Sequence, residues 1–269
     1  LIYNNIVYVS YIREVSPNCF NTSILSSDFK INSFNFDIFY TYDECLSFKN
    51  VKEFNGQQSG GRLVKFDNKI LLTTGEYRKR ELAQNSLSKF GKILEIDLNK
   101  KSSEIFSLGH RNPQGLFVDN DLDLIFSTEH GPYGGDEINL IEKNNNYGWP
   151  ISSYGDHYDG TFKKSAPLHK SHKKYGFTEP LKYFYPSIGI SEITKINEIS
   201  NLENNYYFVS SLKDKTLYLM KYDIVNKRFV EKDKLKINER IRDIIFDEDR
   251  NLYYMILENN ISFGIIKFK

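Results

Sequence analysis

The side chains with the most evident chemistry in this 269-residue sequence lie between positions 109 and 150. Arg111 is a permanent cation whose planar fork of donors suits carboxylate or quinone oxygens, and Asn112 adds a neutral amide beside it. The glycine-rich run 131–135 forces an irregular backbone that exposes carbonyl oxygens, and Asp136 and Glu137 add two carboxylates. Such oxygens on a loop are the ligands that Ca²⁺ prefers. Taken alone, however, an acidic glycine-rich loop is equally typical of a solvated turn.

The elements that position these side chains are expected to be short β-strands. Apolar strands at 70–75, 122–128 and 252–257 each follow an Asp/Asn turn, and an apolar run precedes each turn. Aromatic residues make up 15% of the chain, which favours strands over helices. Hairpins repeating at roughly 50 residues indicate propeller blades, whose period is about 40–50 residues. A β-sandwich, the main rival, explains the strands but not the repeated pattern of turn and strand.

One region interrupts this rhythm and is rich in Gly, Asn, Tyr, Pro, His and Lys: the stretch from about 131 to 186. So long an irregular stretch inside a compact domain is usually functional. We therefore expect one propeller domain over residues 1–269 with a functional loop insertion at about 131–186. Without that insertion, roughly 210 residues remain, enough for four to five blades. A partial ring leaves exposed edges, so we expect an N-terminal blade to be missing from this chain.

Composition restricts the classes of partner. The 36 basic and 35 acidic residues give a net charge of +1, which provides no electrostatic reason to expect nucleic acid. No apolar run reaches the ~18 residues that a membrane-spanning helix needs. Cys19 and Cys45 form either one disulfide, as in an oxidising compartment, or two buried thiols. No CxxC motif suggests a thiolate zinc site.

Three motifs together resemble the signature of the soluble quinoprotein glucose/sorbosone dehydrogenase family. They are GHRNPQGL at 109–116, TEHGPYGGDEINLI at 128–141 and NYGWP at 146–150. The segments 58–64, 209–213 and 238–243 extend the resemblance over most of the chain. The resemblance implies an all-β, six-bladed β-propeller that uses pyrroloquinoline quinone (PQQ) and Ca²⁺. It also implies a periplasmic or secreted protein.

The resemblance implies a cofactor site built from separate blades. Its PQQ-binding residues would be Arg111, Asn112, Lys213, Arg240 and Arg242. PQQ carries three carboxylates and an ortho-quinone, so four cations and an amide would neutralise and orient it. Arg240 and Arg242 alternate along an expected strand and would face the same side. Arg242 is expected to have a catalytic role as well.

The resemblance also implies a calcium site. Its ligands would be the carbonyls of Gly131 and Pro132, the carboxylate of Glu137, Tyr147 through its carbonyl, and Asp156. Asp159 is the alternative to Asp156, because the spacing differs by about a residue.

The sequence departs from the family at the catalytic base. Family members place a histidine before the Gly-Arg pair, where it takes the proton of the substrate hydroxyl, whereas this chain has Gln58. Glutamine forms hydrogen bonds but cannot accept a proton near neutral pH. General-base catalysis contributes typically 10²–10⁴-fold, so its loss should lower turnover by about that factor. His130 and Glu76 are the alternatives that could supply a base.

Three functions are consistent with these residues. The leading hypothesis is a dehydrogenase that oxidises an aldose or related polyol and passes electrons to an external acceptor, because no haem motif such as CxxCH occurs. The second is a propeller that binds PQQ or a sugar with little or no turnover, which Gln58 favours. The third is a calcium-dependent lactonase, which would not need Arg111, Lys213, Arg240 and Arg242 together.

Overall fold

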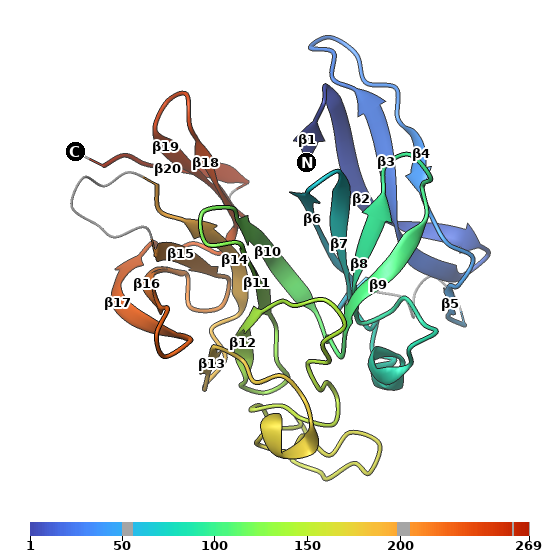
Figure 1. Cartoon of the computed structure of the whole chain (residues 1–269), viewed down its shortest axis with the longest axis vertical. Coiled ribbons are helices and arrows are strands. Elements are labelled where there is room, and N and C mark those ends of the chain that lie inside the picture. The colour runs from blue at the N-terminus through green and yellow to red at the C-terminus, as the bar shows by residue number, and fades with distance from the viewer. Residues whose placement is uncertain (50–55, 198–204, 260, 269) are drawn as a thin grey trace.

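Twenty strands and two short 3-10 helices make up the computed structural model, which describes residues 1–49, 56–197, 205–259 and 261–268. The strands form five antiparallel sheets, each built from consecutive segments of the chain (Figure 1). This radial arrangement of sheets is that of a β-propeller.

The sheets follow one another in chain order. The first sheet contains β1 (Ile2–Tyr3), β2 (Ile6–Ser16), β3 (Cys19–Asp28), β4 (Asp37–Tyr40) and β5 (Leu46–Ser47). The second contains β6 (Gly60–Phe66), β7 (Lys69–Thr74), β8 (Lys92–Asp97) and β9 (Ser103–Leu108). The third contains β10 (Pro113–Asp119), β11 (Leu124–Glu129), β12 (Asp136–Leu140) and β13 (Lys182–Phe184). The fourth contains β14 (Ile190–Lys195), β15 (Tyr206–Ser211), β16 (Thr216–Asp223) and β17 (Arg228–Lys236). The fifth contains β18 (Ile241–Asp247), β19 (Leu252–Leu257) and β20 (Ser262–Ile266).

The strands β2, β6, β10, β14 and β18 line the centre, where each contacts the corresponding strand of the next sheet. An apolar core fills the space between each pair of neighbouring sheets. Strand β7 shows why both faces must be apolar. Leu71 packs toward the third sheet, while Ile70 and Leu72 pack toward the first, and all three are fully buried. Successive side chains of a strand point to opposite faces, so the run Ile-Leu-Leu supplies two cores at once.

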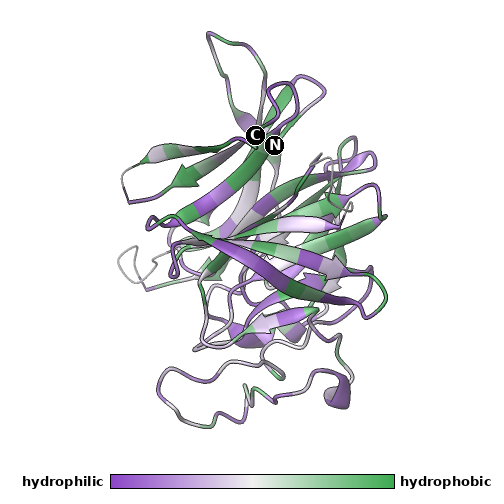
Figure 2. Cartoon of the chain, turned by 90° about the vertical axis from the view of Figure 1, so that its left-hand side faces the viewer, coloured by the Kyte–Doolittle hydropathy of each residue, from purple (hydrophilic) through white to green (hydrophobic). Residues whose placement is uncertain are grey.

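The first and the last sheet leave one side of the ring open among the described residues (Figure 1). The face of the fifth sheet that points away from the fourth carries exposed apolar side chains. They are Ile245, Ile256, Phe263 and Ile265, which are 65%, 44%, 75% and 60% exposed. On the first sheet, Val9 and Ile38 are 39% and 46% exposed. In Figure 2, strands close to the C-terminus are largely green, that is, apolar.

The all-β propeller predicted from the sequence is confirmed, with five sheets in the described part of the chain rather than six. A sixth blade stays a prediction. Each of the expected strands at 70–75, 122–128 and 252–257 is observed, as β7, β11 and β19.

The stretch 131–186 contains β12 and β13, which belong to the third sheet. Between them, residues 141–181 contain only the short helix η2 (Lys173–Tyr175) and project below the sheets in both views (Figures 1 and 2). Cys19 and Cys45 form a disulfide that joins β3 to the segment before β5. No helix in the described part of the chain is long and apolar enough to span a membrane.

Candidate functional site

The predicted cofactor residues lie at one rim of the propeller. In the second to fifth sheets, the first strand begins, and the antiparallel second strand ends, at the same rim. Arg111 and Asn112 precede β10, Gln58 precedes β6, Arg240 precedes β18, and Lys213 follows β15. Antiparallel hairpins therefore bring together residues that are far apart in the sequence.

Arg111 is only 6% exposed and occupies the interior of this rim. Its Nη1 donates to the carbonyl of His130 at 3.0 Å, and its guanidinium lies 5.3 Å from the Trp149 ring centroid. Its Nε is buried and has no hydrogen-bond partner among the described residues. A permanently charged group with an unused donor is suited to an anionic ligand.

Gln58 and Glu76 meet beside Arg111. Tyr77 N donates to the Gln58 carbonyl at 3.0 Å, and Glu76 N donates to the Arg111 carbonyl at 3.0 Å. A Cβ at Gly75 would collide with the Gln58 carbonyl, so the chain can approach this closely only at a glycine. With its amide oriented to satisfy both neighbours, Gln58 Nε2 donates to Glu76 Oε1 and Gln58 Oε1 accepts from Arg111 Nη2 at 2.8 Å.

Glu76 is fully buried. Burial raises its pKa to about 7, although the charges of Arg111 and Arg80 favour the carboxylate. Its second oxygen, Oε2, has no hydrogen-bond partner within the described ranges. A buried carboxyl group with such a pKa can exchange a proton near neutral pH.

Glu258, directly after β19, joins Arg240 and Arg242. Arg240 Nε donates to Glu258 Oε2 at 2.7 Å, and Arg242 pairs with Glu258 Oε1. Burial opposes ionisation of Glu258, but the hydrogen bonds from both arginines hold its pKa below the ordinary value. The two arginines therefore do face the same side, as expected, and they share one carboxylate.

Lys213 and Asn112 complete the predicted cofactor set. Lys213 is exposed, and its backbone N donates to the Ile188 carbonyl at 3.0 Å. Asn112 is buried, and its Oδ1 accepts from Gly60 N at 3.2 Å and from Gln114 Nε2 at 3.1 Å. Lys213 is thus available to a ligand, whereas the amide oxygen of Asn112 already accepts hydrogen bonds from residues of β6 and β10.

A charged network crosses the centre beside the rim. Arg62 of β6 pairs with Glu192 of β14 at 2.6 Å and with Asp243 of β18 at 2.9 Å. Arg62 Nε donates to the Gln114 carbonyl at 3.1 Å, and Gln114 Oε1 accepts from Arg242 Nη1 at 2.7 Å. Four central strands are therefore tied together next to the predicted cofactor site.

Three of the predicted calcium ligands line one small internal cavity: Gly131, Glu137 and Tyr147. Glu129 also lines this cavity, and it lies directly opposite Glu137 where β11 and β12 pair. Burial, reinforced by the charge of Glu129, raises the pKa of Glu137 well above its ordinary value. A divalent cation would relieve this unfavourable burial of two carboxylates.

Pro132 and Asp156 are placed differently. The Pro132 carbonyl accepts a hydrogen bond from Tyr158 Oη at 3.4 Å. The Asp156 carboxylate pairs with Lys170 at 2.7 Å and accepts from Tyr185 Oη at 3.1 Å. Neither residue lines the cavity of Glu137. Among the described His, Cys, Asp and Glu side chains, no group of three or more could hold a metal, so carbonyl oxygens would have to complete the site.

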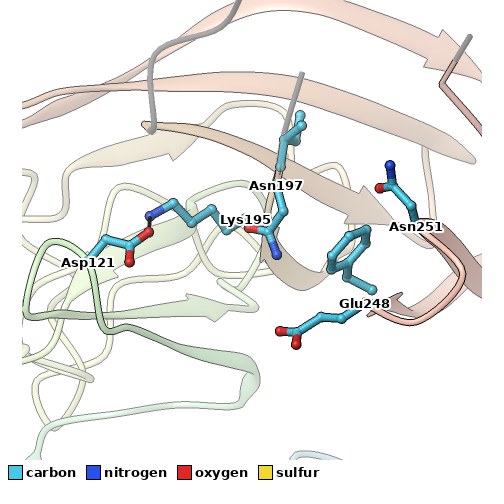
Figure 3. A pocket seen from close by; sticks show the side chains of 7 residues that line it. Asp121, Lys195, Asn197, Glu248 and Asn251 are labelled. Atoms are coloured by element: carbon cyan, nitrogen blue, oxygen red, sulfur yellow. Dashed lines mark hydrogen bonds and ion pairs between the residues drawn. The ribbon is translucent and has the colours of Figure 1, made fainter. Parts of the chain in front are cut away.

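The opposite rim carries a different and larger cavity, of about 540 Å³ (Figure 3). Asp121, Lys195 and Glu248 are among the side chains that line it. Lys195 Nζ pairs with Asp119 at 2.9 Å and with Asp121 at 2.6 Å. This cavity contains none of the predicted cofactor or calcium residues.

Glu258 was not predicted from the sequence as a member of this site. The expected strand at 252–257 and the apolar run before its turn contained the signal, because the pairing of β18 with β19 places Leu257 opposite Ile241 and hence Glu258 beside Arg240. The sequence indicated Glu76 only as a possible base. Its contact with Gln58 could not be predicted, because this contact depends on how the segment 58–60 packs against the segment 73–77.

Known proteins are similar to this chain over most of its length. A family model described as glucose/sorbosone dehydrogenase matches residues 3–263. The aldose sugar dehydrogenase YliI of Escherichia coli strain K12 is 34% identical, over 76% of this chain and 58% of that protein. Quinoprotein glucose dehydrogenase B of Acinetobacter calcoaceticus is 28% identical, over 75% of this chain and 59% of that protein. The chain thus spans somewhat more than half the length of these curated relatives.

Solved structures share the fold. A crystal structure of a glucose dehydrogenase has a TM-score of 0.83 at 24% identity, covering 98% of this chain and 79% of that one. A PQQ-bound aldose sugar dehydrogenase from Streptomyces coelicolor has a TM-score of 0.68 at 19% identity, covering 98% of this chain and 72% of that one.

Proposed function

Because the chain belongs to the glucose/sorbosone dehydrogenase family, we propose that it oxidises an aldose sugar or related polyol with PQQ and Ca²⁺. Electrons would pass to an external acceptor. The observation that carries this proposal is the position of Arg111, Lys213, Arg240 and Arg242 at one rim, although they come from three different sheets.

The residues at the rim fit PQQ. Its carboxylates would bind to Arg240, Arg242 and Lys213, and the unpartnered Nε of Arg111 offers a donor to a further oxygen. Fork-shaped guanidinium groups bind such planar anions through paired hydrogen bonds. Asn112 would bind PQQ as well, while its amide oxygen accepts hydrogen bonds from Gly60 N and Gln114 Nε2.

Ca²⁺ would bind beside this site, between the glycine-rich loop and Glu137. Gly131, Pro132 and Tyr147 would supply carbonyl oxygens, and Glu137 and Asp156 would supply carboxylates. Asp156 would have to leave Lys170 and Tyr185 to do so. Burial raises the pKa of Glu137, and a bound cation would favour its ionised form instead.

In catalysis, bound PQQ would take the hydride of the substrate carbon. The chain's own residues would orient the substrate and receive its hydroxyl proton. Arg242 is held between Glu258 and Gln114 and would keep its charge fixed near the reacting atoms. Gln58, held by Arg111, would accept or donate a hydrogen bond to the sugar but would not take its proton.

We propose further that residues 1–269 form one domain and that a sixth blade closes its ring. The apolar faces with Ile256 and Phe263 on the last sheet and Val9 on the first support this closure. Phe263→Ser should then reduce binding of an apolar fluorescent dye to the isolated chain. Unchanged dye binding would contradict an accessible face of this kind.

The disulfide between Cys19 and Cys45 supports a periplasmic or secreted location, where such bonds persist. Trapping of free thiols in intact cells tests it: both cysteines should resist alkylation until a reductant is added. Free thiols in the cellular protein would contradict this location.

A PQQ- or sugar-binding propeller with little turnover is the second candidate, and Gln58 favours it. The test is a dye-linked assay on a panel of aldoses after loading the protein with PQQ and Ca²⁺, with Gln58→His in parallel. Turnover by the wild type supports the dehydrogenase. Turnover by Gln58→His alone supports the binding protein. A wild type that binds no PQQ overturns the dehydrogenase, and one that binds neither PQQ nor any of the aldoses overturns both.

A further inference from the structure

Oxidation of a sugar hydroxyl releases a proton as well as a hydride, so this site needs a group that can accept the proton. Building on the proposed function, we propose that Glu76 is the catalytic base of this chain and that Gln58 positions the substrate hydroxyl beside it. Two observations support this proposal. Glu76 contacts Gln58 and Arg111, and the neighbouring carboxylates already form ion pairs with arginines.

Glu76 contacts Gln58, which stands at the family's base position, and Arg111, an expected PQQ-binding residue. Its Oε1 accepts from Gln58 Nε2, and its backbone N donates to the Arg111 carbonyl at 3.0 Å. Its Oε2 remains without a partner in the described part of the chain. A buried polar atom without a partner is costly, so an acceptor that is left open needs an explanation. A substrate hydroxyl, bound directly or through one water molecule, would supply the missing hydrogen bond.

Two other carboxylates near the rim are already paired with arginine, and the histidine there has a lowered pKa. Both oxygens of Glu258 bind arginine, and the Asp243 carboxylate pairs with Arg62 at 2.9 Å. His130 has a buried, unpartnered Nε2, but burial and the nearby charges of Arg111 and Arg242 lower its pKa. His130 also adjoins the predicted calcium ligand Gly131. Glu76 is the described acid that combines contact with Gln58 and an open oxygen.

The electrostatic surroundings of Glu76 suit the exchange of a proton near neutral pH. Burial raises its pKa to about 7, and the charge of Glu81 adds to this increase. The pKa is lowered in part by the charges of Arg111 and Arg80 and by a hydrogen bond from the Arg78 backbone. A base is most effective when its pKa lies near the working pH.

Oxidation would break two bonds of the sugar. The proton of the O–H bond would move to Glu76, and PQQ would be the acceptor of the hydride from the C–H bond. The carbon–oxygen bond becomes a carbonyl, so the sugar is oxidised by two electrons and PQQ is reduced by two. Glu76 then releases its proton to solvent before the next turnover.

Glu76→Gln tests the inference, with Glu95→Gln as the control. Glu95 is another buried glutamate, but it pairs with Lys69 and Lys143 away from the site. In PQQ-loaded protein, Glu76→Gln should lower kcat by about 10²–10⁴-fold, whereas Glu95→Gln should not. PQQ affinity should change less than about threefold in both variants, which shows that the site still folds.

The pH profile follows from the sign of the pKa shift. Only the carboxylate accepts a proton, so wild-type kcat/KM should fall as the pH falls below about 7. Infrared difference spectra of cofactor-free protein provide a readout that does not depend on activity. The part of the protonated carboxyl band that titrates near pH 7 should be present in wild type and Glu95→Gln and be lost in Glu76→Gln. The bands of Glu137 and Glu192, two other buried carboxyl groups whose pKa is raised, should remain in all three proteins.

The outcomes separate this inference from the proposed function. If PQQ does not bind, the proposed function fails even if the infrared band titrates as expected. If PQQ binds and Glu76→Gln turns over as fast as wild type, the function stands and Glu76 is not the base. Loaded wild type that is inactive until Gln58→His is introduced also overturns the role of Glu76.

Discussion

Glu258 accepts a hydrogen bond from Arg240, with 2.7 Å between Glu258 Oε2 and Arg240 Nε. Its other oxygen pairs with Arg242. The two arginines that we expect to bind PQQ carboxylates are thus neutralised in part by an acid of the chain itself. An incoming anion must share or displace this carboxylate.

Removing the charge of Glu258 should therefore strengthen PQQ binding. One unit charge at about 4 Å contributes about 1 kcal/mol in water, so Glu258→Gln should lower the Kd about five- to tenfold. Titration with PQQ, followed by absorbance, measures the effect. Glu248→Gln is the control, because Glu248 lies at the opposite rim. Weaker binding by Glu258→Gln would instead mean that the carboxylate serves mainly to orient the arginines.

Lys195 should be essential for stability, because it neutralises a buried carboxylate. Asp119 is 1% exposed, and the Lys195 side chain is 7% exposed. Lys195→Met leaves Asp119 charged and without its cation, which should lower the free energy of unfolding by about 3–5 kcal/mol. Urea denaturation measures this loss.

Asp121→Asn is the matched control, since Asp121 binds the same ammonium group but is 66% exposed (Figure 3). Its loss should cost less than about 1 kcal/mol. Equal losses in the two variants would refute the distinction between the buried and the exposed partner.

The disulfide should stabilise the first sheet. It closes a loop with a sequence separation of 26 residues, so the Cys19→Ser, Cys45→Ser double variant should lose about 2–4 kcal/mol of unfolding free energy. Urea denaturation of the oxidised protein, the reduced protein and the variant measures this. Identical curves for oxidised and reduced protein would show that the bond contributes nothing.

Glu137 should be required for the response to calcium. Ca²⁺ at a hundredfold excess over its Kd should stabilise the wild type by about 2.7 kcal/mol, seen as a higher Tm. Glu137→Gln should abolish the increase, whereas Glu142→Gln, an exposed neighbour, should keep it. Asp156→Asn should reduce it if Asp156 leaves Lys170 on binding. The same increase in Tm for Glu137→Gln would show that Ca²⁺ binds at another site.

The propeller could be predicted because its strands carry local signals. Apolar runs such as 70–74 follow Asp/Asn turns, and these become β7 and its counterparts in other sheets. The position of Arg240 and Arg242 on one side also followed from strand alternation. The repeat period indicated four to five blades in this chain, and the described residues form five sheets. Turn and strand signals do not show where a ring closes, so a sixth blade stays a prediction.

Contacts between blades were much harder to predict. Gln58 and Arg111 are separated by 53 positions, and their meeting depends on how the rims of two sheets pack. The same holds for Arg62 and Glu192, which pair across the centre. Asp156 shows the limit of spacing arguments, since its carboxylate binds Lys170 rather than lining the cavity of Glu137.

The central claim is that one rim of this propeller binds PQQ through cations of separate sheets. The most direct test is titration of the purified chain with PQQ in the presence of Ca²⁺, comparing wild type with Arg111→Ala and with Lys182→Ala, whose lysine lies on the outer strand β13. We predict saturable binding of one PQQ per chain, a Kd at least tenfold higher in Arg111→Ala, and no change in Lys182→Ala. Absence of saturable binding, or equal affinities in all three proteins, would contradict the account.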